Sequence, residues 1–310
     1  MDKKKLIVIA GPTASGKTAV SIELAKRIGG EIISADSMQI YQYMDIGSAK
    51  VSREEMQGIP HYLIDQLNPA EAFHVARFQS MAQNALDQIY AKNKIPIIAG
   101  GTGFYIQSLV RDIEFSVTDQ ELAIRKKVEE YYEKEGRDAL HGWFGLLDEE
   151  GARAIHPNNI KRVMRGIEYY LLTGQKISEH NQEQKEKETP YDLTYIVLTM
   201  ERELLYHRID KRVDQMIEKG LVEEVRFLKE KGFSKDMTSM QGLGYKEILD
   251  YLEGETTLEE AVYRIKRDTR HFAKRQLTWF RREKDTQWIH ADYFQFDSTK
   301  ICDEILRYMK

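Results

Sequence analysis

Short apolar segments alternate with amphipathic ones over the first hundred residues of the chain. Residues 4–10, 31–35 and 95–99 are short runs rich in isoleucine and valine, the pattern of strands buried on both faces. Between them, residues 18–28 and 75–91 place apolar side chains at helical spacing. Strands that alternate with helices predict a parallel, doubly wound α/β sheet, in which ligands bind at the carboxyl ends of the strands.

The pattern changes after about residue 115. Residues 121–135, 136–147 and 158–172 have the pattern of polar helices, with no strand signal among them, and residues 179–190 resemble a polar linker. A helical insertion between two parts of an α/β core is the simplest interpretation.

Strand character returns at residues 192–200. Helical patterns follow at residues 203–219, 221–231 and 258–282, and residues 286–292 predict a last strand before a short terminal helix. The predicted organisation is a core with a helix-rich C-terminal part, made of residues 1–115 and 191–310, and a helical insertion domain at residues 116–190.

The composition favours an ordinary folded protein of the cytoplasm. Of the 310 residues, 42% are hydrophobic and 31% are charged, and no apolar run approaches the roughly 20 residues that a membrane helix needs. The single cysteine, Cys302, excludes an internal disulfide framework and a multi-cysteine zinc site. We expect a monomer that does not enter a membrane.

The net charge of −4 argues weakly against a nucleic-acid partner, but the average conceals a basic segment. Residues 264–284 contain nine lysines and arginines and only two acidic residues, a local charge of +7. Since local charge decides whether a polyanion is attracted, this segment can still bind one.

The clearest motif is GPTASGKT at residues 11–18, which matches the phosphate-binding loop G-x-x-x-x-G-K-[ST] and lies between a predicted strand and helix. Gly11 and Gly16 allow the backbone N–H groups to turn toward phosphate oxygens, and the following helix adds its dipole. Lys17 supplies a positive charge, and Thr18 a hydroxyl that can ligate Mg²⁺. The loop predicts a bound polyphosphate without choosing between a nucleoside triphosphate and another diphosphate.

The third predicted strand lacks the carboxylate with which P-loop NTPases usually hold Mg²⁺, because it ends in the glycine-rich residues 100–103. The acidic residue that follows a strand is Asp36. It could serve as a metal ligand, as a general base or as a turn residue.

Six sequence blocks together resemble those of the tRNA dimethylallyltransferases, also called tRNA isopentenyltransferases. They occur in the family's order, cover nearly the whole chain and read GPTASGKT, ADSMQIYQYMDIGSAK, GGTGFY, HPNNIKRVMRGIE, QGLGYKE and FAKRQLTWFRR. The chain departs from the family pattern at Tyr62, Asn159 and Phe272, outside the loop and away from Asp36. The resemblance is to the compact bacterial form.

This resemblance implies that a dimethylallyl group is transferred from dimethylallyl diphosphate to N6 of the adenosine immediately 3′ of the tRNA anticodon, position 37, with release of pyrophosphate. The N6 amino group is a poor nucleophile, so a carboxylate that takes its proton would help, and Asp36 is assigned this role. Lys17 and Thr18, with Mg²⁺ as cofactor, would neutralise the leaving pyrophosphate.

The resemblance also implies which residues form the site. Asp36, Thr102 and Lys17 are expected to be catalytic, although Thr102 could instead cap a helix. The diphosphate would be bound by Gly11, Pro12, Thr13, Ala14, Ser15, Gly16, Lys17 and Thr18. The anticodon stem-loop of tRNA would contact Asp36, Ser37, Met38, Gln39, Thr102, Arg125, Lys161, Arg162, Val163, Met164, Arg165, Lys274 and Arg275.

A P-loop kinase that phosphorylates a nucleoside or small metabolite is the main alternative. It shares the first strand, the loop and the helix, but it gives no purpose to GGTG or to the basic C-terminal helix. A nucleotide switch or a nucleic-acid-binding ATPase would explain the basic helix but not the DSMQ block.

Overall fold

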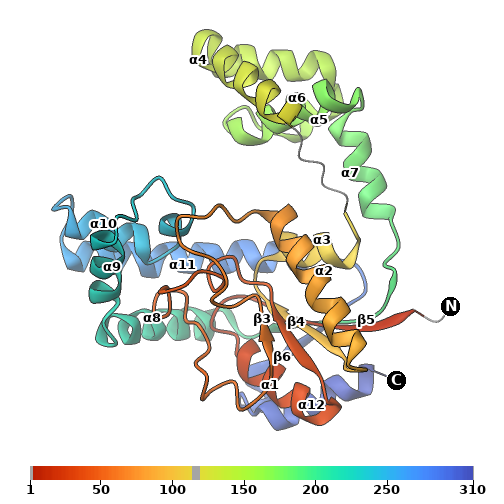
Figure 1. The fold of residues 1–310 in the computed structure, drawn as a ribbon, viewed down its shortest axis with the longest axis vertical. Coiled ribbons are helices and arrows are strands. Elements are labelled where there is room, and N and C mark those ends of the chain that lie inside the picture. The colour runs from red at the N-terminus through yellow and green to blue at the C-terminus, as the bar shows by residue number, and fades with distance from the viewer. Residues whose placement is uncertain (1–2, 114–118, 310) are drawn as a thin grey trace. The chain divides into compact units, whose positions relative to one another are not determined.

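The computed structural model describes residues 3–113 and 119–309 of the chain. The chain divides into two compact units, which can be followed by colour in Figure 1. One unit contains Met1–Asp112 and Thr189–Lys310, and the other contains Ile113–Glu188. The predicted boundary between residues 115 and 116 lies outside the described residues.

A six-stranded parallel sheet forms the centre of the first unit, which confirms the α/β fold predicted from the apolar runs. The strand order is β3-β2-β4-β1-β5-β6. The strands are β1 (Lys4–Ala10), β2 (Glu31–Ser34), β3 (His61–Tyr62), β4 (Pro96–Gly100), β5 (Tyr191–Thr199) and β6 (Thr286–His290). The pattern does not predict β3, because a two-residue strand shows no periodicity.

Helices cover both faces of this sheet. Successive side chains of the central strand β1 point to opposite faces, and both sets are apolar, so each face needs a covering layer. The helices of this unit are α1 (Lys17–Ile28), α2 (Val75–Ala91), α3 (Gly103–Val110), α8 (Arg202–Glu218), α9 (Leu221–Glu230), α10 (Tyr245–Leu252), α11 (Leu258–Phe280) and α12 (Ser298–Tyr308). Leu6 and Val8 join a core with α2, α3, α9, α10 and α11, whereas Ile7 and Ile9 join a second core with α1 and α12.

The loops at the carboxyl edge of the sheet approach its strands so closely that glycine is required. A Cβ atom on Gly11 would collide with the carbonyl oxygen of Leu198 on β5, and the φ of Gly11 is +148°. A Cβ atom on Gly100 would likewise collide with the carbonyl oxygen of Ala35. The residues that follow β1, β2 and β4 are therefore packed against one another at the edge where ligands bind in such folds.

The second unit consists of helices around a small core of its own. The helices are α4 (Asp119–Leu147), α5 (Glu149–Ala154), α6 (Ile160–Thr173) and α7 (Ile177–Glu186). Within α4 the backbone leaves helical geometry at Gly136, where φ is 82° and ψ is −178°, so the segment is two helices joined at a kink. Val128, Phe144 and Ile167 are fully buried between these helices.

The prediction of a polar linker at residues 179–190 is wrong, because α7 continues to Glu186. The first turn of α7 is fixed by the buried carboxylate of Asp148. Its Oδ2 accepts a hydrogen bond from the Ser178 backbone N–H at 2.9 Å, and its Oδ1 accepts one from the Ser178 hydroxyl at 2.7 Å. Glutamate, glutamine and lysine are good helix formers, so a polar sequence with a fixed start forms a helix here.

Asp148 should also make the stability of the second unit depend on pH. Burial alone would raise the pKa of its carboxyl, but hydrogen bonds from Gly151 and Ser178 hold the pKa below its ordinary value. A depressed pKa stabilises the fold above the unfolded-state value of about 3.9, and this contribution is lost as the pH falls through the folded-state pKa.

Asp148 is also the N-cap of α5, where its side chain accepts a hydrogen bond from the Gly151 N–H. We therefore expect Asp148→Ala to lower the free energy of unfolding by about 2 kcal/mol at pH 7, since this cap and the two hydrogen bonds from Ser178 disappear. Urea unfolding followed by circular dichroism measures this change. Asp148→Asn serves as the pH control. The difference in free energy of unfolding between this variant and the wild type should shrink below about pH 4. A difference that is constant between pH 3 and pH 7 would contradict the assignment.

Candidate active site

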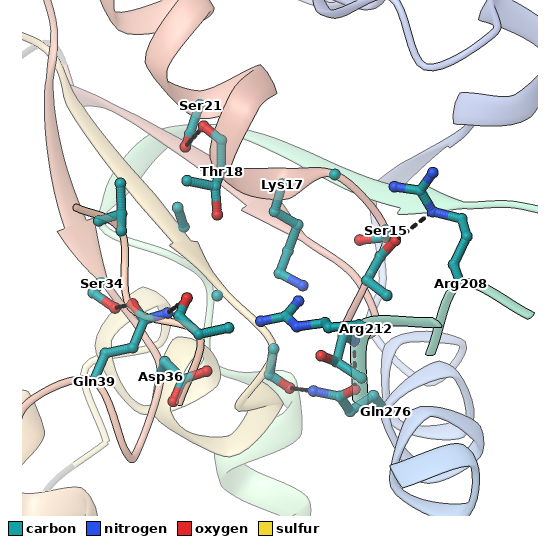
Figure 2. A pocket seen from close by; sticks show the side chains of 18 of the residues that line it. Ser15, Lys17, Thr18, Ser21, Ser34, Asp36, Gln39, Arg208, Arg212 and Gln276 are labelled. Atoms are coloured by element: carbon teal, nitrogen blue, oxygen red, sulfur yellow. Dashed lines mark hydrogen bonds between the residues drawn. The ribbon is translucent and has the colours of Figure 1, made fainter. Parts of the chain in front are cut away.

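A cavity of about 460 Å³ opens at the carboxyl edge of the sheet in the first unit. Figure 2 shows that side chains from the phosphate-binding loop, from the segment after β2, and from α8 and α11 converge on it. The polar residues that line it are Thr13, Ser15, Lys17, Thr18, Ser21, Ser34, Asp36, Gln39, His61, Arg208, Lys211, Arg212, Gln215 and Gln276. The aliphatic side chains in its wall are Ala14, Ile32, Ala49, Val51, Ile64 and Ala99.

The phosphate-binding loop has the left-handed backbone turns that such a cradle requires. Gly16 is the N-cap of α1 with a φ of 92°, and Ala14 has a φ of 63°. The hydroxyl of Ser15 is buried inside the loop and has no hydrogen-bond partner among the described residues. A loop of this geometry at a helix N-terminus binds anions, because its N–H groups and the helix dipole both favour negative charge.

The charge of Lys17 is strongly perturbed in the cavity. Burial, together with the nearby guanidinium of Arg212, lowers its pKa to about 7, while Asp36 acts in the opposite direction. Its Nζ donates a hydrogen bond of 2.6 Å to the carbonyl oxygen of Pro12. Since a bound anion would favour the protonated amine, Lys17 is poised to gain full charge when phosphate enters.

Two arginines of α8 add to this positive charge, and the motif does not predict them. Arg208 donates a hydrogen bond of 3.0 Å from Nε to the carbonyl oxygen of Ala14, and its guanidinium lies 4.1 Å from the centre of the Phe296 ring. Arg212 points into the cavity toward Lys17 and Asp36 (Figure 2). Burial lowers the pKa of both arginines below the ordinary value.

The signal that could have revealed these residues is their spacing. Residues 208, 211, 212 and 215 of the chain are separated by three and four positions, so they share one face of α8. That face supplies three basic side chains to the cavity, Arg208, Lys211 and Arg212.

Gln276 of α11 joins the two glycine-rich loops. Its Oε1 accepts a hydrogen bond of 3.0 Å from the Thr13 N–H, and its Nε2 donates one of 2.9 Å to the carbonyl oxygen of Gly101. Its side chain lies so close to Gly101 that a Cβ atom there would collide with the amide nitrogen. One amide therefore fixes the phosphate-binding loop relative to the end of β4.

Asp36 and Gln39 come from the segment that follows β2. Oδ1 of Asp36 accepts a hydrogen bond of 2.9 Å from the Met38 N–H, so the carboxylate shapes a turn and lines the cavity at the same time. The amide of Gln39 accepts from the Ser34 hydroxyl at 3.0 Å and donates to the carbonyl oxygen of Ala49 at 3.4 Å. Asp36 is the one acidic side chain among the described residues that line the cavity.

Other predicted site residues lie near this cavity or elsewhere on the first unit. Thr102 is the N-cap of α3 by position, but its side chain makes no capping hydrogen bond, and it stands beside the lining residue Gly101. Met38 is partly buried against the main core. Lys274 and Arg275 lie on the exposed side of α11.

The remaining predicted residues belong to the second unit. Lys161 and Arg162 are exposed on α6. Arg125 and Arg165 both pair with the buried carboxylate of Glu168, at 3.3 Å and 3.6 Å.

The segment between these cations has a packing role. Val163 is completely buried in the core of the second unit, and Met164 packs partly against it. Val163 therefore has no exposed surface to offer to an RNA, in contrast to the expectation from the resemblance.

Residues 39–283 match the family described as IPP transferase. The chain belongs to the IPP transferase family. The match covers the segment after β2 from Gln39 onward, the whole second unit and both helices, α8 and α11, that line the cavity.

Relatives of this IPP transferase are similar over almost their full length. A tRNA dimethylallyltransferase of Lachnoclostridium phytofermentans is 54% identical over 300 residues, covering 97% of this chain and 96% of the relative. The tRNA dimethylallyltransferase of Acetivibrio thermocellus is 52% identical over 304 residues, covering 98% and 97%.

Solved structures of related transferases are also similar to this chain over almost its full length. The tRNA isopentenylpyrophosphate transferase of Staphylococcus epidermidis has a TM-score of 0.73 and 46% identity, covering 98% of each chain. A eukaryotic dimethylallyltransferase acting on tRNA has a TM-score of 0.81 and 33% identity, covering 95% of this chain and 76% of that one. In the described part of the IPP transferase, no helix has the length and apolar character needed to cross a membrane.

The buried amine of Lys17 should make the stability of this IPP transferase increase with pH. Because the folded-state pKa is about 7 and an unfolded lysine titrates near 10.4, the unfolded chain binds more protons between these values, and the free energy of unfolding rises across that window. Urea unfolding between pH 6.5 and pH 10 should show the rise in the wild type and not in Lys17→Met. Equal slopes for the two proteins would contradict the assignment.

Gln276→Glu tests the connection between the two loops. The carboxylate can still accept from Thr13 but cannot donate to Gly101, and it adds negative charge beside the phosphate-binding loop. We expect pyrophosphate affinity, measured by calorimetry, to fall by about tenfold or more. The matched control is Gln215→Glu, which adds the same charge to the cavity wall from α8; an equal loss in both variants would show that charge alone is responsible.

Proposed function

We propose that this IPP transferase moves a dimethylallyl group from dimethylallyl diphosphate to N6 of the adenosine at position 37, immediately 3′ of a tRNA anticodon, and releases pyrophosphate. One observation carries the proposal. A phosphate cradle with partly buried cations, a single carboxylate and an aliphatic wall face one cavity of the described residues. An isoprenyl diphosphate needs the cradle and the wall, and an amine nucleophile needs the carboxylate.

The diphosphate is the leaving group in this reaction. The bond between C1 of the prenyl group and its diphosphate oxygen breaks, and the pair of electrons leaves with pyrophosphate. Lys17, Arg212 and the backbone of the loop are placed to hold the charge that develops there. Such preorganised charge is most effective where water is excluded, and Lys17 is partly buried in the cavity wall.

Asp36 takes the proton in this proposal. As N6 bonds to C1, the amino group loses a proton to the Asp36 carboxylate, so the product is a neutral secondary amine and the carboxylic acid. Lys17 and Arg212 both interact electrostatically with Asp36 across the cavity. The target adenosine must leave the anticodon stack to reach this carboxylate.

The aliphatic wall fits the five-carbon group of the donor. Ile32, Val51 and Ile64 line the same cavity as the cradle. Of these, Val51 is 7% exposed and Ile64 is 9% exposed. A prenyl tail against these side chains keeps water from the electrophilic carbon, which would otherwise hydrolyse.

The residues present fit a Mg²⁺ ion. Mg²⁺ prefers hard oxygen ligands and keeps several waters, and the Thr18 hydroxyl and the Asp36 carboxylate both face the cavity. We infer that Thr18 holds the ion, which would add positive charge beside the diphosphate. The buried Ser15 hydroxyl, unpartnered among the described residues, is a further oxygen inside the loop.

Exposed cations on both units fit the phosphate backbone of the tRNA. Lys161 and Arg162 extend from α6, and Lys274 and Arg275 from α11. Contacts of this kind position a nucleic acid without reading its sequence.

A transfer assay tests the function directly. Purified protein, Mg²⁺, dimethylallyl diphosphate and unmodified tRNA should give a tRNA whose digested nucleosides contain dimethylallyladenosine by mass spectrometry. Rapid ATP hydrolysis with unmodified tRNA would refute the proposal and support the kinase alternative.

Asp36→Asn keeps the turn to Met38 but removes the base. We expect kcat to fall by ~10²–10⁴-fold while the Kd for tRNA changes little. Single-turnover transfer and tRNA binding measure the two effects separately. Equal losses in rate and affinity would make Asp36 a binding residue.

Arg162→Ala tests the contact of the second unit with tRNA. We expect the slope of log K against log salt to become shallower by about one, as one phosphate contact is lost. Arg153→Ala is the control, because Arg153 is exposed on the same unit and pairs with Glu149. An unchanged slope in Arg162→Ala would remove Arg162 from the interface.

A further inference from the structure

Two aromatic side chains, Tyr43 and Phe227, stand half-exposed side by side on the first unit. Tyr43 follows the segment that lines the cavity, and Phe227 belongs to α9. Their ring centres are 5.9 Å apart with an angle of 68° between the planes, and their exposed fractions are 46% and 43%. Lys231 lies over both rings, its Nζ 4.8 Å from the centre of Phe227 and 5.6 Å from that of Tyr43.

Tyr43 adopts a backbone conformation that a bulky residue rarely takes. Its φ is 66°, in the left-handed region where glycine is favoured. Backbone strain of this kind persists only where the surrounding structure enforces it, and strained residues are common at active sites and ligand-binding sites. Here the conformation turns an aromatic ring outward between two completely buried neighbours, Tyr41 and Met44.

Glu224 enforces the conformation from α9. Its carboxylate accepts hydrogen bonds from three consecutive backbone N–H groups, those of Asp45 at 2.9 Å, Ile46 at 2.7 Å and Gly47 at 3.0 Å. The hydroxyl of Tyr245 donates a fourth at 2.8 Å. The backbone immediately after Tyr43 is thereby fixed to the helix that carries Phe227.

This position is close to the site where the acceptor base must bind. Tyr43 follows Gln39, which lines the cavity, by four positions in the chain. The chain between them can span at most ~14 Å. A nucleotide next to the target adenosine in the same RNA loop can therefore reach the rings.

We propose that Tyr43, Phe227 and Lys231 form a stacking platform for an unpaired nucleotide of the anticodon loop, one that neighbours the adenosine in the cavity. Half-exposed aromatic rings beside a cation are the chemistry by which proteins hold single-stranded bases and the adjoining phosphate. Stacking tolerates any base, so the platform positions the loop without selecting its sequence. The inference rests on the proposed function, because it takes tRNA as the acceptor.

The test measures binding of a fluorescein-labelled, unmodified anticodon stem-loop by anisotropy, and transfer to the same RNA. Tyr43→Ala should raise Kd by about fivefold or more, because a stacked base loses its partner. Tyr43→Phe keeps the ring and should bind as the wild type does. The KM for dimethylallyl diphosphate should stay unchanged in both variants.

Tyr43→Gly separates binding from folding. Glycine relieves the left-handed strain, so its melting temperature should equal or exceed that of the wild type even though its RNA affinity falls. Tyr308→Ala is the matched control, because Tyr308 is 42% exposed on α12, and its affinity should not change.

Unchanged RNA affinity in Tyr43→Ala would overturn the platform while leaving the transferase function intact. So would an equal loss in Tyr43→Phe, since the hydroxyl rather than the ring would then be responsible. A wild-type protein that neither binds the stem-loop nor modifies it would overturn both the function and the platform.

Discussion

Lys17 and Arg212, both partly buried, share one cavity with a single carboxylate among the described lining residues, Asp36, and this excess of positive charge governs the rest of the site. Buried cations are costly unless something compensates them. Lys17 responds with a pKa lowered to about 7, and Asp36 opposes that change. In the proposed reaction, an arriving diphosphate would supply the missing negative charge at the place where the leaving group forms.

The sheet and its loops maintain this arrangement. Gly11 and Gly100 allow the loops to lie directly on the neighbouring strands, and the amide of Gln276 fixes the two loops relative to each other. Arg208 ties α8 to the phosphate-binding loop through the carbonyl oxygen of Ala14. Because these contacts come from helices far along the chain, the cavity forms only when the C-terminal part of the first unit has folded onto the N-terminal strands.

The sequence predicted the elements and residues whose signal is local. The parallel sheet was predicted from the apolar runs, and the phosphate-binding loop from the eight consecutive residues 11–18. Both signals lie in residues that are neighbours in the sequence. The sequence did not predict that Arg208 and Gln276 belong to the site. Their contacts with the phosphate-binding loop join residues 194 and 263 positions apart, and no local pattern indicates such a contact. Helix α7 was missed because its start depends on the carboxylate of Asp148, 30 residues earlier.

In the proposed function, the phosphate-binding loop receives an isoprenyl diphosphate and not the triphosphate of a nucleotide. Calorimetric titration of the protein with Mg²⁺ and a non-reactive thiolo analogue of dimethylallyl diphosphate, in the presence and absence of ATP, tests it most directly. We expect the analogue to bind at one site per chain, with an affinity at least tenfold above that of ATP, and Val51→Asp to abolish this preference by placing charge in the aliphatic wall. Tighter binding of ATP, or a preference that Val51→Asp leaves intact, would contradict the account.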